Sequence, residues 1–368
     1  MFIDKILLKN YRNIKETMLD LSPNLNIILG YNGQGKTNLL ESIYLLGTGS
    51  SHRSNIDSDL INWHREKALV QVLLKKKDQD LRLSLIFTAS QKRIEINNTP
   101  YKKISDLIGN LNIVLFSPED LNLIKGGPSY RRKFLDIEVS QVSPYYYHLL
   151  NEYKHILKQR NNLLKNIRDR KDNKELLEVW DEKLVEIGSK VINKRIDVVE
   201  KLKLLARLGQ RKITNGSENL KIDYDCSLSN TGKKEETDII FKQDLVNNRK
   251  EEIYKGYTIF GPHRDDLILK VNDIDIRKFG SQGQQRTTAL ALKLAELEFM
   301  KSETGEYPVL LLDDVFSELD ELRRDTLLSV VTDRIQTIIT ATDLSIPSVL
   351  KRDHYKVFNV REGNIKEE

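Results

Sequence analysis

The stretch Gly30-Tyr31-Asn32-Gly33-Gln34-Gly35-Lys36-Thr37 decides the fold class of this chain. It fits the pattern G-x-x-x-x-G-K-[ST] in full, and its surroundings fit as well. The apolar run Leu25–Leu29 before it predicts a buried strand, and apolar residues at helical spacing after it predict a helix. In such a loop, backbone N–H groups surround phosphates and the helix N-terminus favours their negative charge. We therefore expect a P-loop domain that binds ATP with Mg²⁺.

Two side chains of this loop have distinct expected roles. Lys36 is expected to reach the β and γ phosphates, and Thr37 is expected to ligate Mg²⁺. The residues expected to contact the nucleotide here are Gly30, Asn32, Gly33, Gln34, Gly35, Lys36, Thr37 and Asn38.

A second apolar strand, Val309–Leu312, ends in two carboxylates. Asp313 at the strand end suits a Mg²⁺ ligand of the Walker B kind. Asp314 suits the orientation or deprotonation of an attacking water, so Lys36, Asp313 and Asp314 are the expected catalytic residues. Paired acids after a strand are also typical of a solvated turn or a helix cap, and the P-loop upstream favours the catalytic interpretation.

The third motif is Ser281-Gln282-Gly283-Gln284-Gln285-Arg286, which opens an apolar helix and resembles the signature of ABC ATPases. A serine hydroxyl and a bare glycine at a helix N-terminus suit a phosphate, so Ser281, Gly283 and Gln284 are expected nucleotide contacts. In this class the signature faces the nucleotide of the opposite subunit, which predicts an ATP-dependent homodimer. An ordinary capped helix is the alternative. Ser317–Asp320 then resembles the D-loop of the dimer interface.

The two halves of the nucleotide site stand far apart in the chain, and a helical segment lies between them. Apolar residues at near-heptad spacing in 149–167 and 177–198 predict two antiparallel helices that form an arm. Strand-like segments return at 257–260, 267–271, 309–312 and 337–340. We expect an α/β ABC/SMC-type ATPase head assembled from both chain ends with an inserted arm: residues 1–120 and 256–368 form the head and residues 121–255 the arm.

Composition limits the setting of the protein. Hydrophobic residues make up 39% and charged residues 31% of the 368 residues, which is typical of a globular protein. No apolar run is long enough to span a membrane, the first residues lack a signal-peptide pattern, and Cys226 is the single cysteine, so a cytoplasmic location is expected. A formal net charge of +5 permits a nucleic-acid partner without demonstrating one.

With these motifs in place, the chain resembles the RecF family of bacterial recombinational repair proteins nearly from end to end. The stretches that carry the resemblance are 8–13, 30–41, 51–53, 116–120, 127–136, 261–266, 281–286 and 312–320. The resemblance implies an ATP-dependent DNA-binding dimer with weak ATPase activity. It also implies partners, RecO and RecR, with which the family helps RecA replace single-strand-binding protein at gapped DNA.

Three departures from the wider ABC pattern concern turnover. Asp314 stands where ABC transporters have glutamate, and Thr340-Ala341-Thr342-Asp343 carries no switch histidine. Ser117-Pro118-Glu119 occupies the region where a Q-loop glutamine is usual. These departures favour a switch over a motor.

Several basic and aromatic residues keep two interpretations each. Arg12 suits contact with a phosphate of ATP or of DNA, Arg53 suits phosphate or adenosine contact, and His263 and Arg264 suit organisation of the site. Solvated surface positions fit all four equally. A DNA-facing role or a merely solvated face fits the basic residues Arg131, Arg132, Lys133, Lys201, Lys203 and Arg207. Tyr145-Tyr146-Tyr147 predicts packing at the base of the arm, with base stacking as the alternative.

Two other functions compete with the ATP-gated DNA-binding dimer. A P-loop phosphotransferase would need an acceptor pocket under a compact lid, whereas the insert predicts an arm. An ABC nuclease would need a phosphoesterase domain rich in metal-binding histidine and aspartate, and the chain has six histidines, none clustered.

Overall fold

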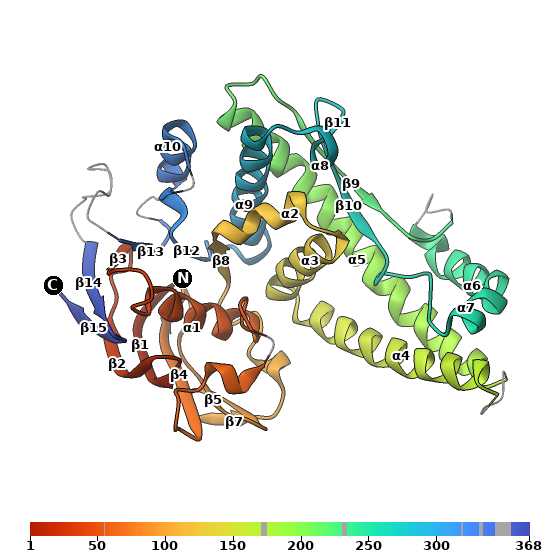
Figure 1. Ribbon diagram of the computed structural model, residues 1–368, viewed down its shortest axis with the longest axis horizontal. Coiled ribbons are helices and arrows are strands. Elements are labelled where there is room, and N and C mark those ends of the chain that lie inside the picture. The colour runs from red at the N-terminus through yellow and green to blue at the C-terminus, as the bar shows by residue number, and fades with distance from the viewer. Residues whose placement is uncertain (55, 171–174, 230–233, 318, 331–333, 343–354) are drawn as a thin grey trace.

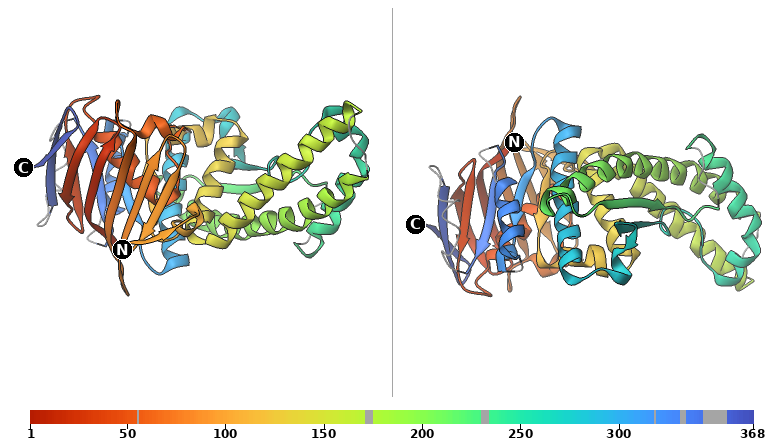
Figure 2. Two further views of the ribbon diagram at one scale, coloured as in Figure 1. Left: turned by 90° about the horizontal axis from the view of Figure 1, so that it is seen from below. Right: turned by 90° about the horizontal axis from the view of Figure 1, so that it is seen from above.

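The structure is a computed structural model that describes residues 1–54, 56–170, 175–229, 234–317, 319–330, 334–342 and 355–368. Figure 1 shows two lobes. A sheet lobe contains both chain ends, and an elongated helical lobe projects away from it in both views of Figure 2. Glu318 of the expected D-loop and Asp343 of the expected switch segment lie outside the described residues.

The described residues form the following strands and helices. The strands are β1 (Phe2–Tyr11), β2 (Ile14–Asp20), β3 (Leu25–Leu29), β4 (Lys67–Lys75), β5 (Asp80–Thr88), β6 (Lys92–Ile96), β7 (Thr99–Tyr101), β8 (Ile113–Phe116), β9 (Leu220–Asp225), β10 (Asp266–Val271), β11 (Ile274–Asp275), β12 (Val309–Leu312), β13 (Thr337–Ala341), β14 (Tyr355–Arg361) and β15 (Asn364–Glu367). The helices are α1 (Lys36–Thr48), α2 (Asn122–Lys125), α3 (Pro128–Val142), α4 (Pro144–Arg168), α5 (Leu176–Ile213), α6 (Thr237–Asn247), α7 (Arg249–Lys255), α8 (Ile276–Phe279), α9 (Gln282–Thr304) and α10 (Glu321–Val330).

The central sheet has the order β15-β14-β3-β13-β12-β8, and its strands are parallel except for β15. β3 and β8 come from the first part of the chain and the other four from the last part, so the predicted assembly from both chain ends is confirmed. β3, β8 and β12 are buried along their whole length, because a parallel sheet is covered on both faces.

Alternate residues of this sheet belong to two different cores. Ile28, Leu311 and Ile338 pack with α1 and the antiparallel sheet β2-β1-β4-β5-β6-β7. Their neighbours Ile27 and Leu310 pack with the core of the helical lobe. Side chains of a strand point to opposite faces in turn, so one short sheet joins the two lobes.

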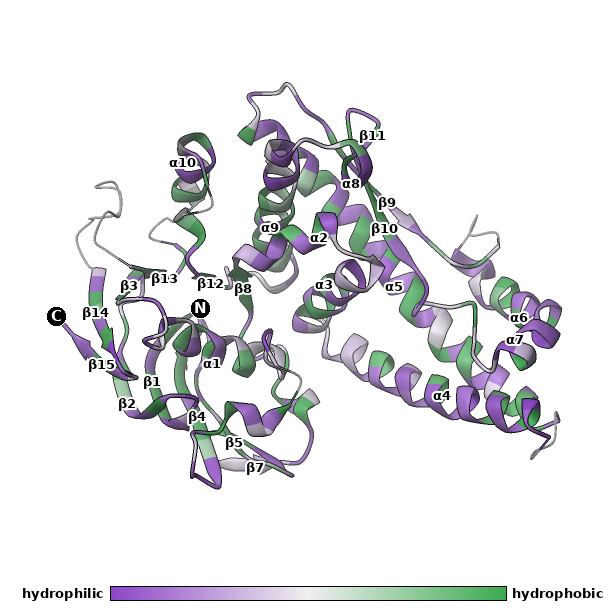
Figure 3. Cartoon of the chain, in the orientation of Figure 1, coloured by the Kyte–Doolittle hydropathy of each residue, from purple (hydrophilic) through white to green (hydrophobic). Residues whose placement is uncertain are grey.

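The helical lobe is built on the predicted arm. α4 and α5 pack side by side with their heptad-like residues buried, and α9 packs against α5 (Figure 1). Figure 3 shows hydrophobic residues along α9 and β8, whereas α4 carries a largely hydrophilic face. Arg160 on α4 is fully buried, and its guanidinium binds Asp181 at 2.7 Å and Glu252 at 2.7 Å, which ties α4, α5 and α7 together.

The packing does not follow the expected division after residue 255. β9, on the arm side of that division, pairs along its full length with β10 on the other side, and α9 packs on α5. Residues 266–304 thus lie with the helical lobe. The predicted strand 257–260 is also wrong: the N–H groups of Thr258 and Ile259 donate to the Asn161 and Glu252 side chains and not to a neighbouring strand.

Among the described residues, no helix is long and apolar enough to cross a membrane.

Candidate nucleotide site

The P-loop connects β3 to α1 at the carboxyl end of the central sheet. Gly33 and Gly35 have φ of 78° and 117°, conformations that glycine adopts without strain. A Cβ atom on Gly35 would lie 2.7 Å from Asn13 Oδ1, so the loop also needs glycine for space. The glycines therefore allow the backbone to adopt the loop conformation that leads into the N-terminus of α1.

Lys36 lies inside this loop. Its side chain is buried, and Nζ donates to the Gly30 carbonyl oxygen at 2.8 Å. A buried ammonium next to the N-terminus of α1 makes the loop electropositive, as phosphate binding requires.

The structure brings together the two predicted Mg²⁺ ligands. Thr37 Oγ1 donates to Asp313 Oδ1 at 3.0 Å, across the strands β3, β13 and β12. A hydroxyl and a carboxylate beside a phosphate loop are the oxygen donors that Mg²⁺ takes in nucleotide sites, so this pair fits the ion. Burial raises the pKa of Asp313, and hydrogen bonds from Thr340 and Thr37 only partly offset this.

Thr340 positions both carboxylate residues, a role that the sequence did not predict. Its Oγ1 donates to Asp313 Oδ1 at 2.8 Å and accepts from the Asp314 N–H at 2.9 Å. Asp314 adopts a left-handed conformation with φ of 50°, which aspartate tolerates better than most residues. The signal was available in part, because Thr340 lies at the end of a predicted strand next to the Walker B strand.

Arg12 and Arg53 converge on a buried carboxylate. The Arg12 guanidinium binds Glu41 through two bonds of 2.7 and 3.0 Å. Ser51 Oγ donates to the same carboxylate at 2.5 Å, and Arg53 Nη1 lies 3.8 Å from it. Burial acts to raise the pKa of Glu41, but the hydrogen bonds from Arg12 and Ser51 outweigh it and hold that pKa below its usual range. Glu41 therefore stays ionised and fixes both arginines.

These two arginines border a pocket of about 860 Å³ next to the first turn of α1. Its lining residues are Arg12, Asn13, Lys15, Asn38, Arg53, Asp59, Ile61, Asn62, Trp63, His64 and Arg65. The lining carries more cations than carboxylates, with Asp59 as its one acid, and Trp63 adds an exposed aromatic ring. The pocket is thus chemically suited to the sugar and base of a nucleotide whose phosphates lie in the P-loop.

Gln34 and Asn38, two of the predicted nucleotide contacts, have side chains engaged inside the protein. Gln34 Oε1 accepts from the Glu362 N–H at 2.6 Å, so the β14–β15 turn holds the P-loop. Asn38 donates to Asn13 Oδ1 at 2.8 Å and accepts from Arg53 at 2.8 Å. Asn13, which also donates to the Gln34 carbonyl at 2.9 Å, is a loop-holding residue that the sequence reasoning did not single out.

The predicted signature begins α9 in the helical lobe. Ser281 caps this helix: its Oγ accepts from the Gln284 N–H at 3.2 Å, and Gln284 Oε1 accepts from the Ser281 N–H at 3.1 Å. Arg323 on α10 donates to the Gly283 carbonyl at 2.7 Å. Ser281 is exposed, and within the described part of the chain none of the hydrogen bonds of this turn reaches the P-loop of the other lobe.

The predicted basic cluster on α3 is only partly available to a ligand. Arg131 is buried and paired with Asp266 through two bonds of 2.8 Å, so the interpretation as a DNA contact is wrong for this residue. Arg132 donates to the Asp265 carbonyl at 2.7 Å, and Lys133 is exposed. On the arm, Lys201 pairs with Glu303 at 2.6 Å.

His263 has a defined tautomer. Nε2 lies 3.1 Å from the Thr258 carbonyl oxygen, which can only accept, so Nε2 carries the proton and Nδ1 accepts from Tyr153 Oη at 2.6 Å. Burial lowers the pKa of His263 to about 4, so the ring is neutral at neutral pH. Tyr146 is buried as core packing predicts, whereas Tyr145 is exposed.

A P-loop with a Walker B strand in one lobe and a capped signature helix in the other defines the ABC/SMC-type ATPase heads. In agreement, the family model described as RecF/RecN/SMC N terminal domain matches residues 2–366. An Smc head domain from Pyrococcus furiosus has the same fold with a TM-score of 0.57 at 18% identity, covering 100% of this chain and 96% of that one.

Closer relatives identify the family within this class. A DNA replication and repair protein RecF from Halothermothrix orenii is 58% identical over 99% of this chain and 98% of its own length. The RecF of Alkaliphilus oremlandii is 44% identical over 99% and 100%. A solved recombination mediator protein RecF bound to ATP, of the RecFOR pathway, is 36% identical with a TM-score of 0.92, covering 100% of this chain and 97% of that one. The chain belongs to the RecF family.

Proposed function

We propose that this chain is an ATP-dependent DNA-binding protein of recombinational repair that closes into a homodimer around ATP and Mg²⁺. Its weak ATPase activity opens the dimer again, and in the cytoplasm it acts with RecO and RecR to help load RecA at gapped DNA. The support for the pathway is the ATP-bound RecF relative described as part of it.

One observation carries the dimer. Thr37 and Asp313 meet in the sheet lobe, while the exposed Ser281 cap stands on the helical lobe of the same chain. A helix N-terminus with a serine hydroxyl suits a phosphate, and in the described part of the chain the P-loop lies in the other lobe. A second copy, related by a two-fold axis, supplies each P-loop with the other subunit's signature.

The roles at the site follow from its contacts. Lys36 and the P-loop N–H groups hold the β and γ phosphates, and the pocket beside Arg12 and Arg53 takes the adenosine. Thr37 and Asp313 hold Mg²⁺, which neutralises charge that develops on the phosphates. Asp314 orients the attacking water. The Asp314 N–H donates to Thr340 Oγ1, which holds the residue in place.

Sedimentation velocity with and without ATP-Mg²⁺ tests this assignment. Ser281→Arg leaves ATP binding by the monomer intact and abolishes ATP-dependent dimerisation, because the arginine fills the space of the partner's γ-phosphate. Lys36→Ala is the matched control, since it loses ATP binding itself. A Ser281→Arg variant that still dimerises on addition of ATP contradicts the shared site.

The phosphotransferase alternative gains no support from the structure. The segment between the two halves of the nucleotide site forms an elongated lobe that projects from the sheet lobe (Figure 2). Within the described residues, no group of three or more His, Cys, Asp or Glu side chains could hold a metal ion, as a nuclease site would require.

A further inference from the structure

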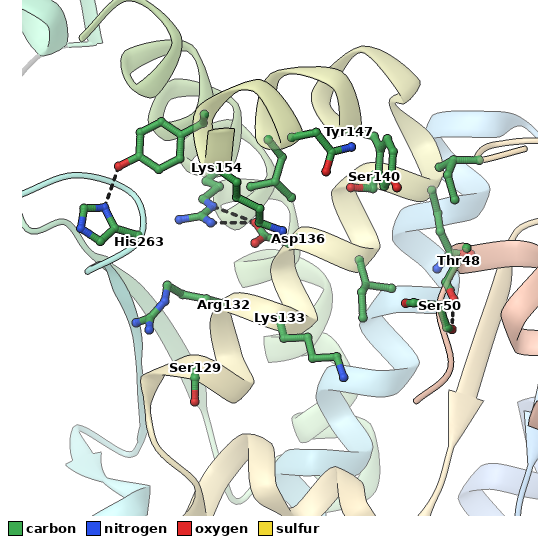
Figure 4. A pocket seen from close by; sticks show the side chains of 18 of the residues that line it. Thr48, Ser50, Ser129, Arg132, Lys133, Asp136, Ser140, Tyr147, Lys154 and His263 are labelled. Carbon is green, nitrogen blue, oxygen red and sulfur yellow. Dashed lines mark hydrogen bonds and ion pairs between the residues drawn. The ribbon is translucent and has the colours of Figure 1, made fainter. Parts of the chain in front are cut away.

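A second polar pocket lies where the two lobes meet, away from the P-loop. It has a volume of about 460 Å³ and is bounded by the end of α1, by α3 and by α4, with His263 at one end (Figure 4). The stretches 127–136 and 261–266, which carry no role in the nucleotide site, both contribute to its lining. Its volume is in the range of about 300–1,000 Å³ that is typical of small-ligand pockets.

The deep wall of the pocket is rigid and has no unbalanced charge. Arg195 is buried and donates to Asp136 Oδ1 at 2.7 Å and to the Pro262 carbonyl at 2.5 Å. Tyr146 Oη donates to the same Asp136 oxygen at 2.6 Å. Because Arg195 neutralises Asp136, the one carboxylate of the lining does not repel an anion.

The remaining charged groups of the lining are all cations: Arg132, Lys133 and Lys154. Lys133 and Lys154 are exposed and form no ion pair with any described residue. Burial lowers the pKa of the Arg132 guanidinium, with a further contribution from Arg195, while Asp266, Asp265 and Asp136 oppose this shift. Ser129 and Ser140 add hydroxyl groups that can donate to an anion.

The electrostatic effects of the two helix ends at this pocket on an anion nearly cancel. Ser129 lies in the first turn of α3, whose positive end favours an anion, while Thr48 ends α1, whose negative end disfavours one. The choice of ligand therefore rests on the side-chain cations. A phosphomonoester carries about −1.5 to −2 charge at neutral pH and three acceptor oxygens, whereas a phosphodiester within a strand carries one charge. The net positive charge of the lining, with Asp136 already paired to Arg195, favours the more highly charged monoester.

We propose that this pocket binds a phosphomonoester group on a nucleotide-sized ligand, supplied either by the end of a DNA strand or by a free nucleotide. A phosphate inside a continuous duplex lies on the convex outer surface of the double helix, so it cannot enter a pocket of this size. A strand end or a single nucleotide can. Only the strand-end source depends on the proposed DNA binding.

The test uses the full-length chain with Lys36→Ala as background, so that the P-loop does not bind nucleotide. Fluorescence anisotropy compares one labelled single-stranded oligonucleotide that ends in a phosphate with the same oligonucleotide ending in a hydroxyl. Isothermal titration calorimetry measures dAMP binding in parallel. The variants are Lys133→Ala/Lys154→Ala, the charge-keeping Lys133→Arg/Lys154→Arg, and Lys158→Ala, an exposed lysine one turn further along α4 that does not line the pocket.

If the strand end is the ligand, the terminal phosphate tightens binding by roughly tenfold, the contribution of about one charge-assisted hydrogen bond. The double alanine variant loses this gain, whereas the double arginine variant and Lys158→Ala keep it. If a free nucleotide is the ligand, dAMP binding shows the same dependence on the two lysines and the oligonucleotide end has no effect.

Three results overturn the proposal. One is the absence of both a terminal-phosphate effect and lysine-dependent dAMP binding. Another is an effect that survives in the double alanine variant. The third is an equal loss of affinity for circular DNA, which has no ends, because the lysines would then contact the backbone of any DNA. None of these results bears on ATP-dependent dimerisation, which is measured separately.

Discussion

At the scale of single residues, Asp314 is the clearest test of catalysis. Its left-handed backbone and its N–H bond to Thr340 are both compatible with asparagine, which also tolerates positive φ. Asp314→Asn therefore keeps the shape of the site and removes the carboxylate that accepts a proton from water. We expect slower ATP hydrolysis, by about 10²-fold or more, with the ATP-bound dimer preserved.

The measurement is phosphate release under single-turnover conditions, with sedimentation as the check on the dimer. Asp313→Asn serves as the contrast, because it weakens Mg²⁺ binding and so raises the Mg²⁺ concentration needed for turnover. Equal hydrolysis rates in wild type and Asp314→Asn would remove Asp314 from its proposed role.

A buried charged cluster that includes Lys293 and Glu296 of α9 provides a prediction on stability. Lys293 Nζ lies 2.5 Å from Glu296, both side chains are buried, and the Phe116 and Phe134 rings lie 5.8 and 5.7 Å from the ammonium. Burial raises the pKa of Glu296, and Lys293 opposes this rise. Lys293→Met removes the counter-charge of this buried carboxyl and is expected to cost about 3–5 kcal/mol of unfolding free energy if Glu296 is ionised in the wild type. Urea denaturation measures this cost, and a loss below about 1 kcal/mol would show that Glu296 is not ionised there.

Glu138 in the same cluster behaves in the opposite way. Burial and the neighbouring Glu296 raise its pKa well above the usual range, against the effect of Lys293, so the carboxyl is protonated in the folded protein. Glu138→Gln mimics this neutral form and is expected to cost little. A raised pKa of an acid stabilises the fold below the usual pKa, and this contribution is lost as the pH rises through the folded-state value. The wild type therefore loses stability relative to Glu138→Gln as the pH increases above the usual glutamate pKa, as urea titrations across pH will show.

At the scale of elements, one arginine connects the segment after Walker B to the signature helix. Arg323 on α10 donates to the Gly283 carbonyl at 2.7 Å and to Thr287 Oγ1 at 2.6 and 2.9 Å. Arg323 also contacts Asp320, so the start of α9 is held by the element that follows Asp313 and Asp314. We expect this contact to couple the two elements.

Arg323→Ala should weaken ATP-dependent dimerisation by about tenfold or more while ATP binding by the monomer is unchanged, because the signature turn loses its outer support. Arg323→Lys is expected to rescue little, since an ammonium lacks the planar fork that makes these bonds. Fluorescent-ATP titration and sedimentation separate the two properties. An Arg323→Ala variant that dimerises like wild type would place the control of α9 elsewhere.

The elements also show which kinds of structure a sequence predicts. β12 and the α4–α5 pair were predicted because apolar runs and heptad spacing are local signals. The strand expected at 257–260 was wrong, because the Thr258 N–H binds Asn161 on α4, which is distant in the sequence, and the Ile259 N–H binds Glu252 on the preceding helix α7. Arg131 looked like surface charge for the same reason: its partner Asp266 lies on a strand far along the chain. Contacts with residues far along the chain set the structure around Thr258 and Arg131, and the periodicity of the sequence does not reveal such contacts.

The candidate site divides along the same line. The motif residues Lys36, Thr37 and Asp313 could be placed from their spacing alone, and the structure puts the last two in contact. Thr340 and Asn13 could not, because each acts by hydrogen bonds that hold other residues of the site, and neither belongs to a motif with a known spacing.

At the scale of the whole molecule, the structure separates functions between its lobes. The sheet lobe contains the P-loop, Asp313 and Asp314, and the helical lobe contains the start of α9 and the exposed cations Lys133, Lys154 and Arg207. In the proposed dimer, closure around ATP would bring two helical lobes into a fixed relation. DNA that binds these lobes would then meet twice as many cations on the dimer as on the monomer.

ATP should for this reason strengthen DNA binding and steepen its dependence on salt. Each phosphate that a cation neutralises releases counterions, with a slope of about −0.9 in log affinity against log salt per contact on duplex DNA. Arg207 on α5 is exposed and forms no ion pair with a described residue, so Arg207→Ala should flatten the slope by about 1 and weaken all sequences alike. Lys201→Ala is the matched control on the same helix, because Glu303 already neutralises that lysine. The measurement is fluorescence anisotropy on duplex and gapped DNA over a salt series, with and without ATP-Mg²⁺. If ATP leaves both the affinity and the slope unchanged, dimerisation does not add DNA contacts, and the proposed coupling of ATP to DNA binding is wrong. The shared nucleotide site is tested separately by Ser281→Arg.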